Sequence, residues 1–387
     1  MPPAIPSRSR KVAAVGIALS DCGRVDGVTP FALHAQAARR ALADCGLDRG
    51  VIDGVASAGL GTLAPVEVAE YLGLAPRWVD STSVGGATWE VMAAHAAEAI
   101  AAGRANAVLL VYGSTARADI KAGRRTSNLS FGARGPLQFE APYGHSLIAK
   151  YAMAARRHMH EYGTTRDHLF NVALACRNRA NQNPAAMMYE RPLTRDMYMT
   201  SRWISEPLCL FDNCLETDGA LACVVVSAER ARDCRTTPVY VHSVAQGLPS
   251  QHHGMVNYWN DAPLSGPAWT AARHLWKQAD FGPQDVDVAQ IYDAFTPLIP
   301  LSLEGYGFCG RGEGGAFTEG GALESGGRLP INTGGGGLSE AYVHGFNLIN
   351  EGVKQLRGTS TAQVPDASTC LVTAGEGVPT SALLLRA

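Results

Sequence analysis

The chain has 387 residues, of which 46% are apolar and 18% charged, and its formal net charge is −2. That length allows two core-forming domains or one large duplicated fold. No basic stripe favours nucleic acid as a partner, and no apolar run approaches the ~20 residues of a membrane span. The nine cysteines form no CxxC pair and no metal-like spacing, and residues 1–11 lack the apolar centre of a secretory signal. We therefore expect a cytoplasmic protein with reduced thiols and no bound metal.

Short apolar strands alternate with helices through the first half of the sequence. We expect buried strands at 11–20, 52–58, 107–112 and 220–226. We expect helices at 30–45, 66–72, 89–102, 146–162 and 165–181. The start of the last helix, at 164–167, fits an N-cap, whereas the glycine- and arginine-rich residues 120–143 interrupt the alternation. Apolar strands bounded by helices favour a parallel sheet that is covered on both faces.

From Val239 the same order of elements begins again. The pattern predicts strands at 239–244, 286–292, 369–374 and 380–385. It predicts helices at 267–279 and 339–356. We therefore predict an α/β protein of two similar halves, one at 1–235 with an excursion at about 113–215 and the other at 236–387.

Two segments of the second half carry the strongest chemical signal. The first reads Tyr292-Asp293-Ala294-Phe295-Thr296 at the end of an apolar strand, and the second reads Gly334-Gly335-Gly336-Gly337-Leu338-Ser339-Glu340-Ala341-Tyr342-Val343-His344-Gly345. A phenol can donate and accept a hydrogen bond, so Tyr292 and Tyr342 are candidate acid/base groups. We expect Asp293 to hold the loop backbone and His344 to stand behind Tyr342.

These segments resemble the second-half active-site blocks of the thiolase superfamily. The family blocks usually read His-Asp-x-Phe or Asn-Glu-Ala-Phe, and Gly-Gly-x-x-x-x-Gly-His-Pro-x-Gly. In this chain Tyr292 and Tyr342 occupy both polar catalytic positions of the family. The resemblance therefore implies a thiolase-like frame whose chemistry has changed.

The positions of the two thiolase cysteines are also altered. The first cysteine lies at a helix start as Cys-x-x-Gly, and Ser83 takes its place when the turn is aligned on Gly86. A serine without an adjacent base is a poor acyl acceptor, so we expect Ser83, Gly85 and Gly86 to form an open turn that offers substrate its backbone N–H groups. The second cysteine aligns with Val372 or Thr373, and Cys370 beside them reads as a buried strand residue.

Other segments are similar to the lipid-transfer, sterol-carrier-protein-type branch of the superfamily and to its steroid side-chain aldolases. They lie at 152–159, 162–165, 181–184, 207–212, 218–220, 307–314 and 355–359. The resemblance implies an αβαβα layered fold, a homodimer and an acyl-CoA substrate. It also implies retro-aldol cleavage of a β-hydroxyacyl-CoA, such as a steroid side-chain thioester, into a ketone and a shorter acyl-CoA. The branch works with a small OB-fold partner that bears a zinc ribbon, so zinc is expected only in that partner.

Retro-aldol chemistry needs no covalent acyl-enzyme, in keeping with the missing nucleophile. One tyrosine would take the hydroxyl proton and the other would protonate the enolate, and the sequence does not assign the two roles. Enolate stabilisation would come from backbone donors at Gly85, Gly86 and the Gly334–Gly337 loop, which includes Gly336. Tyr143 and His145, in the excursion, are candidate substrate contacts.

Two alternatives stay open at this point. The chain could be a thiolase with a relocated nucleophile, for which Cys309 is the best candidate. It could also be a non-catalytic acyl-CoA- or lipid-binding subunit, in which both tyrosines could be lost without effect.

Overall fold

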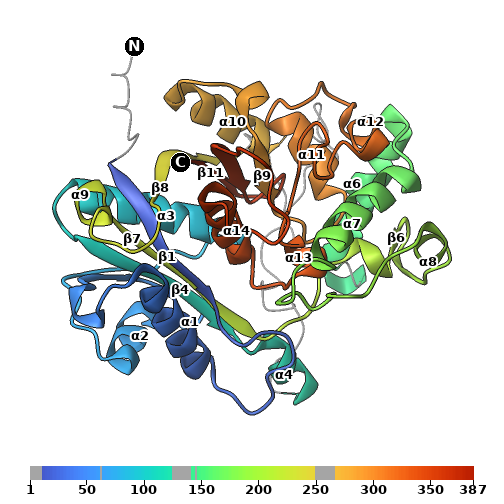
Figure 1. The fold of residues 1–387 in the computed structure, drawn as a ribbon. Coiled ribbons are helices and arrows are strands. Elements are labelled where there is room, and N and C mark those ends of the chain that lie inside the picture. Colours follow the sequence, from blue (N-terminus) through green and yellow to red (C-terminus); the bar gives the residue numbers. More distant parts are fainter. Residues whose placement is uncertain (1–10, 62, 124–140, 144–145, 249–265) are drawn as a thin grey trace.

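A nine-stranded sheet forms the centre of the molecule (Figure 1). A computed structural model describes residues 11–61, 63–123, 141–143, 146–248 and 266–387. The strand order is β3-β2-β4-β7-β1-β8-β11-β10-β9. The strands of this sheet are β1 (Val12–Leu19), β2 (Gly54–Ala56), β3 (Trp78–Asp80), β4 (Ala107–Ser114), β7 (Gly219–Ser227), β8 (Val239–Gly247), β9 (Val288–Ile291), β10 (Thr369–Thr373) and β11 (Thr380–Arg386).

The two arms of the sheet have matching pairings. β7 lies antiparallel between β1 and β4, and β11 lies antiparallel between β8 and β10. The pairs β2/β4 and β9/β10 are both parallel. β3 extends the first arm, and its counterpart in the second arm is a single bridge between Ala289 and Ile331. The arms meet where β1 pairs antiparallel with β8 through Ala13 and Ala14.

The expected parallel sheet is therefore wrong, because the sheet is mixed. Strands that are buried on both faces are mostly apolar, and such a run carries no information on strand direction. β7 and β11 are strands of this kind, with almost every residue buried. The direction of β7 and of β11 depends on the path of the chain segment that precedes each strand.

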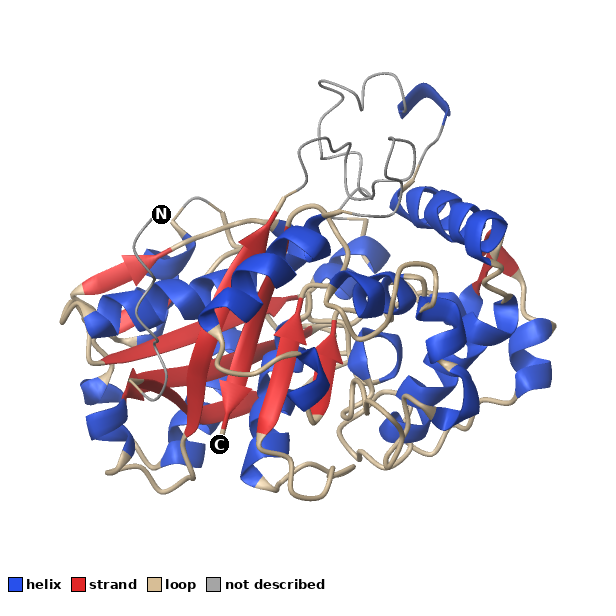
Figure 2. Ribbon diagram, turned by 90° about the horizontal axis from the view of Figure 1, so that it is seen from above, coloured by secondary structure: helices blue, strands red, loops and turns tan. Residues whose placement is uncertain are grey.

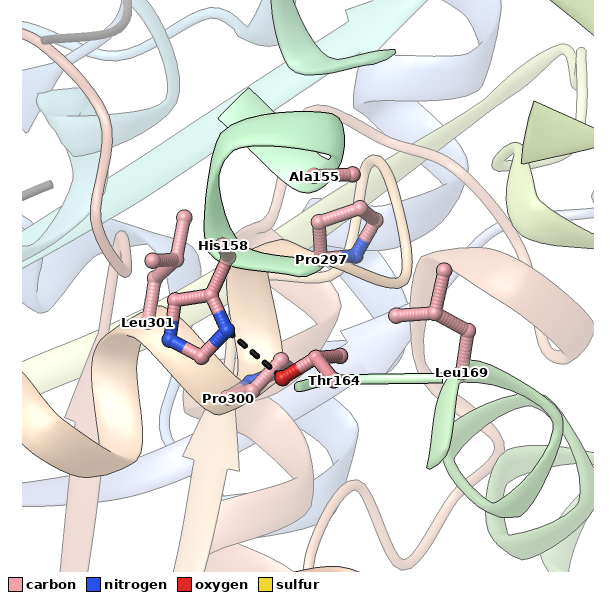
Figure 3. A pocket seen from close by; sticks show the side chains of 7 residues that line it. All are labelled: Ala155, His158, Thr164, Leu169, Pro297, Pro300 and Leu301. Atoms are coloured by element: carbon pink, nitrogen blue, oxygen red, sulfur yellow. Dashed lines mark hydrogen bonds between the residues drawn. The ribbon is translucent and has the colours of Figure 1, made fainter. Parts of the chain in front are cut away.

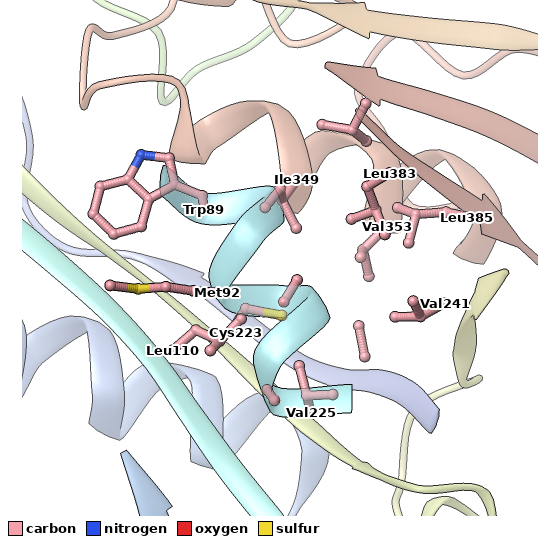
Figure 4. Close-up of a cluster of buried hydrophobic side chains, with 14 of the residues drawn as sticks. Trp89, Met92, Leu110, Cys223, Val225, Val241, Ile349, Val353, Leu383 and Leu385 are labelled. Carbon is pink, nitrogen blue, oxygen red and sulfur yellow. The ribbon is translucent and has the colours of Figure 1, made fainter. Parts of the chain in front are cut away.

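The strands separate three layers of helices. α1 (Pro30–Cys45) covers the outer face of the first arm, and α10 (Pro267–Gln278) covers the outer face of the second. α3 (Thr88–Ala101) and α14 (Phe346–Arg357) lie between the two arms. Figure 4 shows this central layer, where Met92 of α3 and Val353 of α14 are buried among strand side chains of both arms. The αβαβα arrangement that the resemblance implied is confirmed.

The alternation of side chains along the strands explains why both faces are filled. On β7, Leu221, Cys223 and Val225 belong to the central core, whereas the even-numbered residues from Ala220 to Val226 face α1. Successive strand residues point to opposite faces, so one apolar strand supplies two cores. Each side of β7 therefore needs its own helix layer.

Local signals fix the helix ends. Thr29 accepts a hydrogen bond from the Ala32 amide (3.2 Å) at the start of α1, and Gly46 ends that helix with φ 76°. The expected N-cap of the helix at 165–181 is confirmed, because Thr165 accepts a hydrogen bond from the His168 amide (3.4 Å). These caps satisfy amide and carbonyl groups that the helices leave unpaired.

The described residues of the excursion from 146 onwards form a helical region beside the sheet (Figure 2). It contains α6 (Leu147–Tyr162), α7 (Arg166–Ala180), α8 (Arg195–Met199) and the short pair β5 (Trp203–Ser205) and β6 (Leu208–Cys209). Among the described residues, the other helices of four or more residues are α2 (Ala64–Leu72), α4 (Ala116–Lys121), α9 (Ala228–Ala231), α11 (Leu298–Gly305), α12 (Gly314–Phe317) and α13 (Gly336–Ser339). No helix among the described residues combines the length and the apolar character that crossing a membrane requires.

The helix expected at 339–356 is only partly right. α13 ends at Ser339 and α14 begins at Phe346, so residues 340–345 form a bend that contains Tyr342. His344 (φ 55°) and Gly345 (φ 85°) both adopt left-handed backbone conformations, which an α-helix cannot contain. A Cβ atom added at Gly345 would lie 2.6 Å from the Tyr292 ring, so the bend also needs a glycine there for close packing.

Candidate active site

The two tyrosines meet. Tyr292 directly follows β9, and Tyr342 lies in the bend between α13 and α14. Their hydroxyl oxygens are 2.7 Å apart, and either group can be the donor. The ring centroids are 6.2 Å apart and the rings are inclined by 56°. A phenol–phenol hydrogen bond thus joins two segments that are separated in the sequence.

The pKa values of both phenols are raised. Burial raises the pKa of Tyr292 well above its ordinary value, and the neighbouring Tyr342 raises it further. Burial also raises the pKa of Tyr342, and the hydrogen bond between the two hydroxyls partly offsets this rise. Both side chains keep some contact with solvent. At neutral pH the pair is therefore uncharged, and each hydroxyl holds a proton that it can transfer.

Asp293 connects the first tyrosine block to the glycine turn. Its carboxylate accepts hydrogen bonds from the Gly337 amide (2.7 Å) and the Leu338 amide (3.2 Å). The Cys176 thiol donates a third hydrogen bond, at 3.5 Å. Burial raises the pKa of Asp293 to about 6. A side chain at Gly336 would collide with the carboxylate, so this glycine leaves the space that the Asp293 contacts need.

Other side chains hold the backbone on either side of the tyrosines. Asn332 accepts a hydrogen bond from the Ile291 amide (2.7 Å) and donates one to the Ile291 carbonyl (2.8 Å), directly before Tyr292. The Thr217 hydroxyl donates to the Tyr342 carbonyl at 2.6 Å. The buried Trp89 indole donates to the His344 carbonyl at 2.7 Å. These contacts fix the backbone positions from which both phenols project.

His344 lies against the ring of Tyr342. The two ring centroids are 6.2 Å apart in an edge-on arrangement, and the Tyr112 ring lies 6.1 Å from His344. The left-handed backbone of His344 is uncommon for a residue with a side chain. The imidazole therefore stands beside the tyrosine pair, held there through the Trp89 hydrogen bond to its carbonyl.

Only part of the turn before α3 reaches the tyrosine pair. A Cβ atom added at Gly86 would lie 2.9 Å from Tyr292 Cζ and 3.2 Å from its hydroxyl oxygen. Gly85 adopts φ 63° and is exposed, as is Ser83. The Thr88 hydroxyl organises the turn through the Val84 amide (3.1 Å) and the Gly85 carbonyl (2.6 Å). Gly86 is thus a direct neighbour of the site, whereas the Ser83 side chain faces solvent.

Of the two excursion candidates, the structure describes only Tyr143. Tyr143 closes a short 3-10 helix, Ala141–Tyr143, and 89% of its side chain is exposed. Its ring is thereby out of contact with Tyr292 and Tyr342. His145 lies outside the described residues.

The cysteines do not supply an activated thiol at the pair. Cys309 is partly exposed, and burial raises its pKa to about 12. Cys370 is fully buried in β10, as the sequence predicts. Val372 and Thr373, the candidate matches for the second thiolase cysteine, are also buried, and the Thr373 hydroxyl is hydrogen-bonded to the Tyr306 hydroxyl (2.6 Å). Neither Cys309 nor Cys370 therefore offers a thiolate near neutral pH, and Val372 and Thr373 have no thiol.

A small cavity lies apart from the tyrosine pair (Figure 3). Its volume is about 10 Å³, roughly the space that one water molecule needs. His158 borders it and is hydrogen-bonded to the Thr164 hydroxyl (2.6 Å) and to Glu304 (2.7 Å). The contact with Glu304 ties α6 to α11, and the cavity is too small for a substrate. Within the described ranges no group of three or more potential metal ligands occurs.

Sequence reasoning missed the residues that hold the backbone. Asn332 stands in a left-handed conformation (φ 44°) before the glycine run, and asparagine near glycine is a known signal for such a turn. Nothing in the sequence links Thr217 or Trp89 to the tyrosines, since their contacts cross more than a hundred residues of chain.

Comparisons with known proteins agree with this geometry. A family model described as "Thiolase C-terminal domain-like" matches residues 250–385. The chain is 41% identical to the 17-hydroxy-3-oxo-4-pregnene-20-carboxyl-CoA lyase of Mycobacterium tuberculosis, over 97% of this chain and 99% of that protein. It is 39% identical to the steroid side-chain-cleaving aldolase of Thermomonospora curvata, over 97% of both.

The chain belongs to the steroid side-chain aldolases of the thiolase superfamily. The structure of the Ltp2-ChsH2(DUF35) aldolase matches this aldolase-family chain with a TM-score of 0.85 and 37% identity, over 98% of both chains. The acetyl-CoA acetyltransferase of Syntrophomonas wolfei, at 18% identity and a TM-score of 0.68, shares the fold with 98% of this chain. The chain is thus a thiolase-fold aldolase relative along its whole length.

Proposed function

We propose that this chain cleaves a β-hydroxyacyl-CoA by a retro-aldol reaction, releasing a ketone and a shorter acyl-CoA without a covalent acyl-enzyme. The observation that carries this proposal is the 2.7 Å contact between the hydroxyls of Tyr292 and Tyr342. The names of the relatives, a lyase and a side-chain-cleaving aldolase, support the same class of reaction.

The paired phenols can move one proton without forming a free phenolate. The substrate hydroxyl gives its proton to the oxygen of one tyrosine, while that tyrosine passes its own proton across the contact to the other. The Cα–Cβ bond breaks, its electron pair forms the thioester enolate, and the β-carbon becomes a ketone. The second tyrosine delivers its own proton to Cα as the relayed proton arrives. Both phenols end as they began, which suits groups whose raised pKa disfavours the charged form.

We propose a steroid side-chain CoA thioester as the substrate. In a 17-hydroxy-pregnene-20-carboxyl-CoA, the compound in the relative's name, the thioester is attached to carbon 20 and the hydroxyl to the neighbouring carbon 17. The hydroxyl is therefore β to the thioester, as a retro-aldol reaction requires. Cleavage between these carbons leaves a 17-ketone, and carbon 20 leaves with its methyl group and thioester as propionyl-CoA.

The proposal disfavours a thiolase with a relocated nucleophile. Cys309 would need to be a thiolate, and its pKa of about 12 keeps it protonated at neutral pH. Coenzyme A enters as part of the substrate, and no other cofactor is required for the proton transfers described.

We also propose the setting in which the chain works. The match to the Ltp2-ChsH2(DUF35) aldolase supports a protein partner, and the family resemblance makes it a small OB-fold protein with zinc confined to its ribbon. The edge strand β3, with Val79 45% exposed, is a suitable face for a homodimer. The nine free thiols fit the reducing cytoplasm.

The test is to co-express the chain with its OB-fold/zinc-ribbon partner and assay ketone release from 17-hydroxy-3-oxo-4-pregnene-20-carboxyl-CoA. We expect ketone and propionyl-CoA in equal amounts, and an intact protein mass that is unchanged after rapid quenching. An accumulating acyl-protein would favour thiolase chemistry. Normal activity in both Tyr292→Phe and Tyr342→Phe would favour a non-catalytic role for the pair.

A further inference from the structure

The proposed reaction places negative charge on the thioester oxygen while the tyrosine pair handles protons. Preorganised donors at such an oxygen are a large source of catalysis. The Gly334–Gly337 turn offers fewer unpaired backbone N–H donors than its four glycines suggest. The Gly335 amide already donates to the Asn332 carbonyl (2.8 Å), and the Gly337 amide donates to Asp293 (2.7 Å). Half of these four amides are thus committed to holding the turn.

Tyr151 offers a donor from another element. It lies in α6, and only 2% of its side chain is exposed. Its ring packs 4.6 Å from that of Phe295, three positions after Tyr292. Tyr292 and Tyr342 both pack against the buried cluster that contains Tyr151. The pKa of each of these two phenols is raised first by burial and, as the last contribution, by the charge that Tyr151 would carry if ionised.

The loop between β10 and β11 joins Tyr151 to the site. A Cβ atom added at Gly375 would lie 3.2 Å from the Tyr292 carbonyl oxygen. A Cβ atom added at Gly377, two residues later, would lie 3.3 Å from the Tyr151 hydroxyl oxygen. One short glycine-containing loop therefore borders both the backbone of Tyr292 and the hydroxyl of Tyr151.

The Tyr151 hydroxyl forms no hydrogen bond with any described residue, and its oxygen is not one of the fully buried side-chain atoms that lack a partner, so the oxygen keeps contact with open space although the residue as a whole is 2% exposed. A hydroxyl donor that has no protein partner and borders open space beside a reaction site is available to a ligand. Burial, and then the nearby Glu376, raises the pKa of Tyr151, so the group keeps its proton and remains a donor. Glu376 is itself buried, and its pKa is raised to about 8.

We propose that Tyr151 is a third catalytic tyrosine, whose hydroxyl donates a hydrogen bond to the thioester oxygen of the substrate. This inference rests on the proposed retro-aldol function. Tyr151 exchanges no proton and forms no covalent bond. It stabilises the oxygen while the electron pair of the breaking carbon–carbon bond resides on the enolate, and the interaction weakens again when Cα is protonated.

The test is the Tyr151→Phe variant, with Tyr162→Phe on the same helix as a matched control. Removing a hydroxyl that has no protein partner leaves the Phe295 packing in place, so we expect an unchanged melting temperature. We expect kcat for ketone release to fall about 10²- to 10³-fold, the scale for loss of one oxyanion donor, with KM within about threefold. The control should retain wild-type kcat. A Tyr151→Phe kcat within about threefold of wild type would overturn the inference.

A second measurement does not depend on the variant or on turnover. A crystal structure of the wild-type complex with propionyl-CoA should place the Tyr151 hydroxyl about 2.5–3.0 Å from the thioester oxygen. A thioester oxygen bound elsewhere would overturn the role of Tyr151. If the wild type released no ketone, the proposed function would fail and this structure would still decide the inference. If the wild type were active, Tyr342→Phe inactive and Tyr151→Phe active, only the inference would fail.

Discussion

The turn before α3 and the turn before Tyr342 stand at comparable places in a thiolase frame, yet they differ in how firmly they are built. The first leaves Ser83 and Gly85 exposed, and Gly86 lies against Tyr292. The second is held from within by Asp293, which is 1% exposed and accepts two amide hydrogen bonds from it. Under the proposed function, the N-terminal turn would supply space, whereas the C-terminal turn would hold a reactive group in a fixed position.

Under the proposed function, this contrast accounts for a thiolase fold that lacks the catalytic cysteines of thiolases and still carries out a reaction. A nucleophile at the N-terminal turn would need an activating base close to it, and the exposed Ser83 has none of the burial that fixes such geometry. Two phenols that share a hydrogen bond need only each other and a substrate hydroxyl. The sharpest tests therefore alter one turn and leave the other intact.

The largest effect is expected at the C-terminal turn itself. Tyr342→Phe removes one hydroxyl of the pair and breaks the proton path, so we expect kcat to fall roughly 10²-fold or more. Ketone release under single-turnover conditions is the measurement, and Tyr71→Phe on the outer helix α2 is the control. Retained activity in Tyr342→Phe would remove the C-terminal turn from the chemistry.

A smaller loss is expected when the support of that turn is weakened. Asp293→Asn can accept only one of the two amide hydrogen bonds and brings an N–H₂ group towards the other amide. We expect the free energy of unfolding to fall by about 1–3 kcal/mol, the cost of an unsatisfied buried donor, and kcat to fall about tenfold. Chemical denaturation and ketone release measure the two effects. Wild-type values of both would show that Asp293 does not hold the turn.

The N-terminal turn can be tested at its one point of contact. Gly86→Ala places a methyl group 2.9 Å from Tyr292 Cζ, so the ring must move. We expect kcat to fall about tenfold, because misplaced reacting groups lose much of their rate enhancement. Gly50→Ala is the matched control, since a Cβ atom there meets no atom within 4 Å. Equal activity in the two variants would contradict the contact.

Glu90 is a buried carboxyl group in α3, close to the same turn, and its effect on stability can be tested through pH. It accepts a hydrogen bond from Ser381 (3.1 Å), and burial raises its pKa to about 7. The folded-state pKa is higher than the unfolded one, so the stability that Glu90 contributes is present at low pH and lost as pH rises through about 7. Glu90→Gln stays neutral, so its unfolding free energy relative to wild type should rise by roughly 1–3 kcal/mol between about pH 4.5 and 7 and stay constant above that range. Glu98→Gln, exposed on the same helix, should show no such trend.

The smallest effect is expected for Ser83→Ala. The Ser83 side chain is exposed and away from the fixed part of the site, so kcat and KM should both stay within about twofold of wild type. A loss as large as that of Tyr342→Phe would return the chemistry to the N-terminal turn.

The sequence was informative where local chemistry and element order decide the outcome. The helix at 30–45 and the apolar strands could be predicted because caps and burial leave a local pattern. Strand direction could not, since a doubly buried strand such as β7 is apolar in either direction. The bend at 340–345 was mistaken for helix, because its left-handed conformations depend on contacts with Trp89 and Tyr292.

Some features of the candidate site could also be predicted from the sequence, and others could not. Tyr292 and Tyr342 could be singled out from two motifs, and their contact could not be derived from sequence spacing alone. The roles of Asn332, Thr217 and Tyr151 depend on packing between distant elements, which leaves no local pattern in the sequence.

The remaining assignments concern a bound substrate and stay predictions. Gly86, Gly336 and His344 lie beside the tyrosine pair or its supporting carboxylate, where a substrate contact is possible. Ser83 and Gly85 are exposed on the rim of the N-terminal turn. A structure with a bound acyl-CoA would decide each of these contacts.

The most direct measurement is a double-mutant cycle on the two phenols, with single-turnover ketone release from wild type, Tyr292→Phe, Tyr342→Phe and the double variant. Groups that act as one unit lose most of their effect with the first substitution. We predict that the double variant is about as slow as the slower single variant. Losses that multiply would show that the two phenols act independently, contradicting a shared proton path.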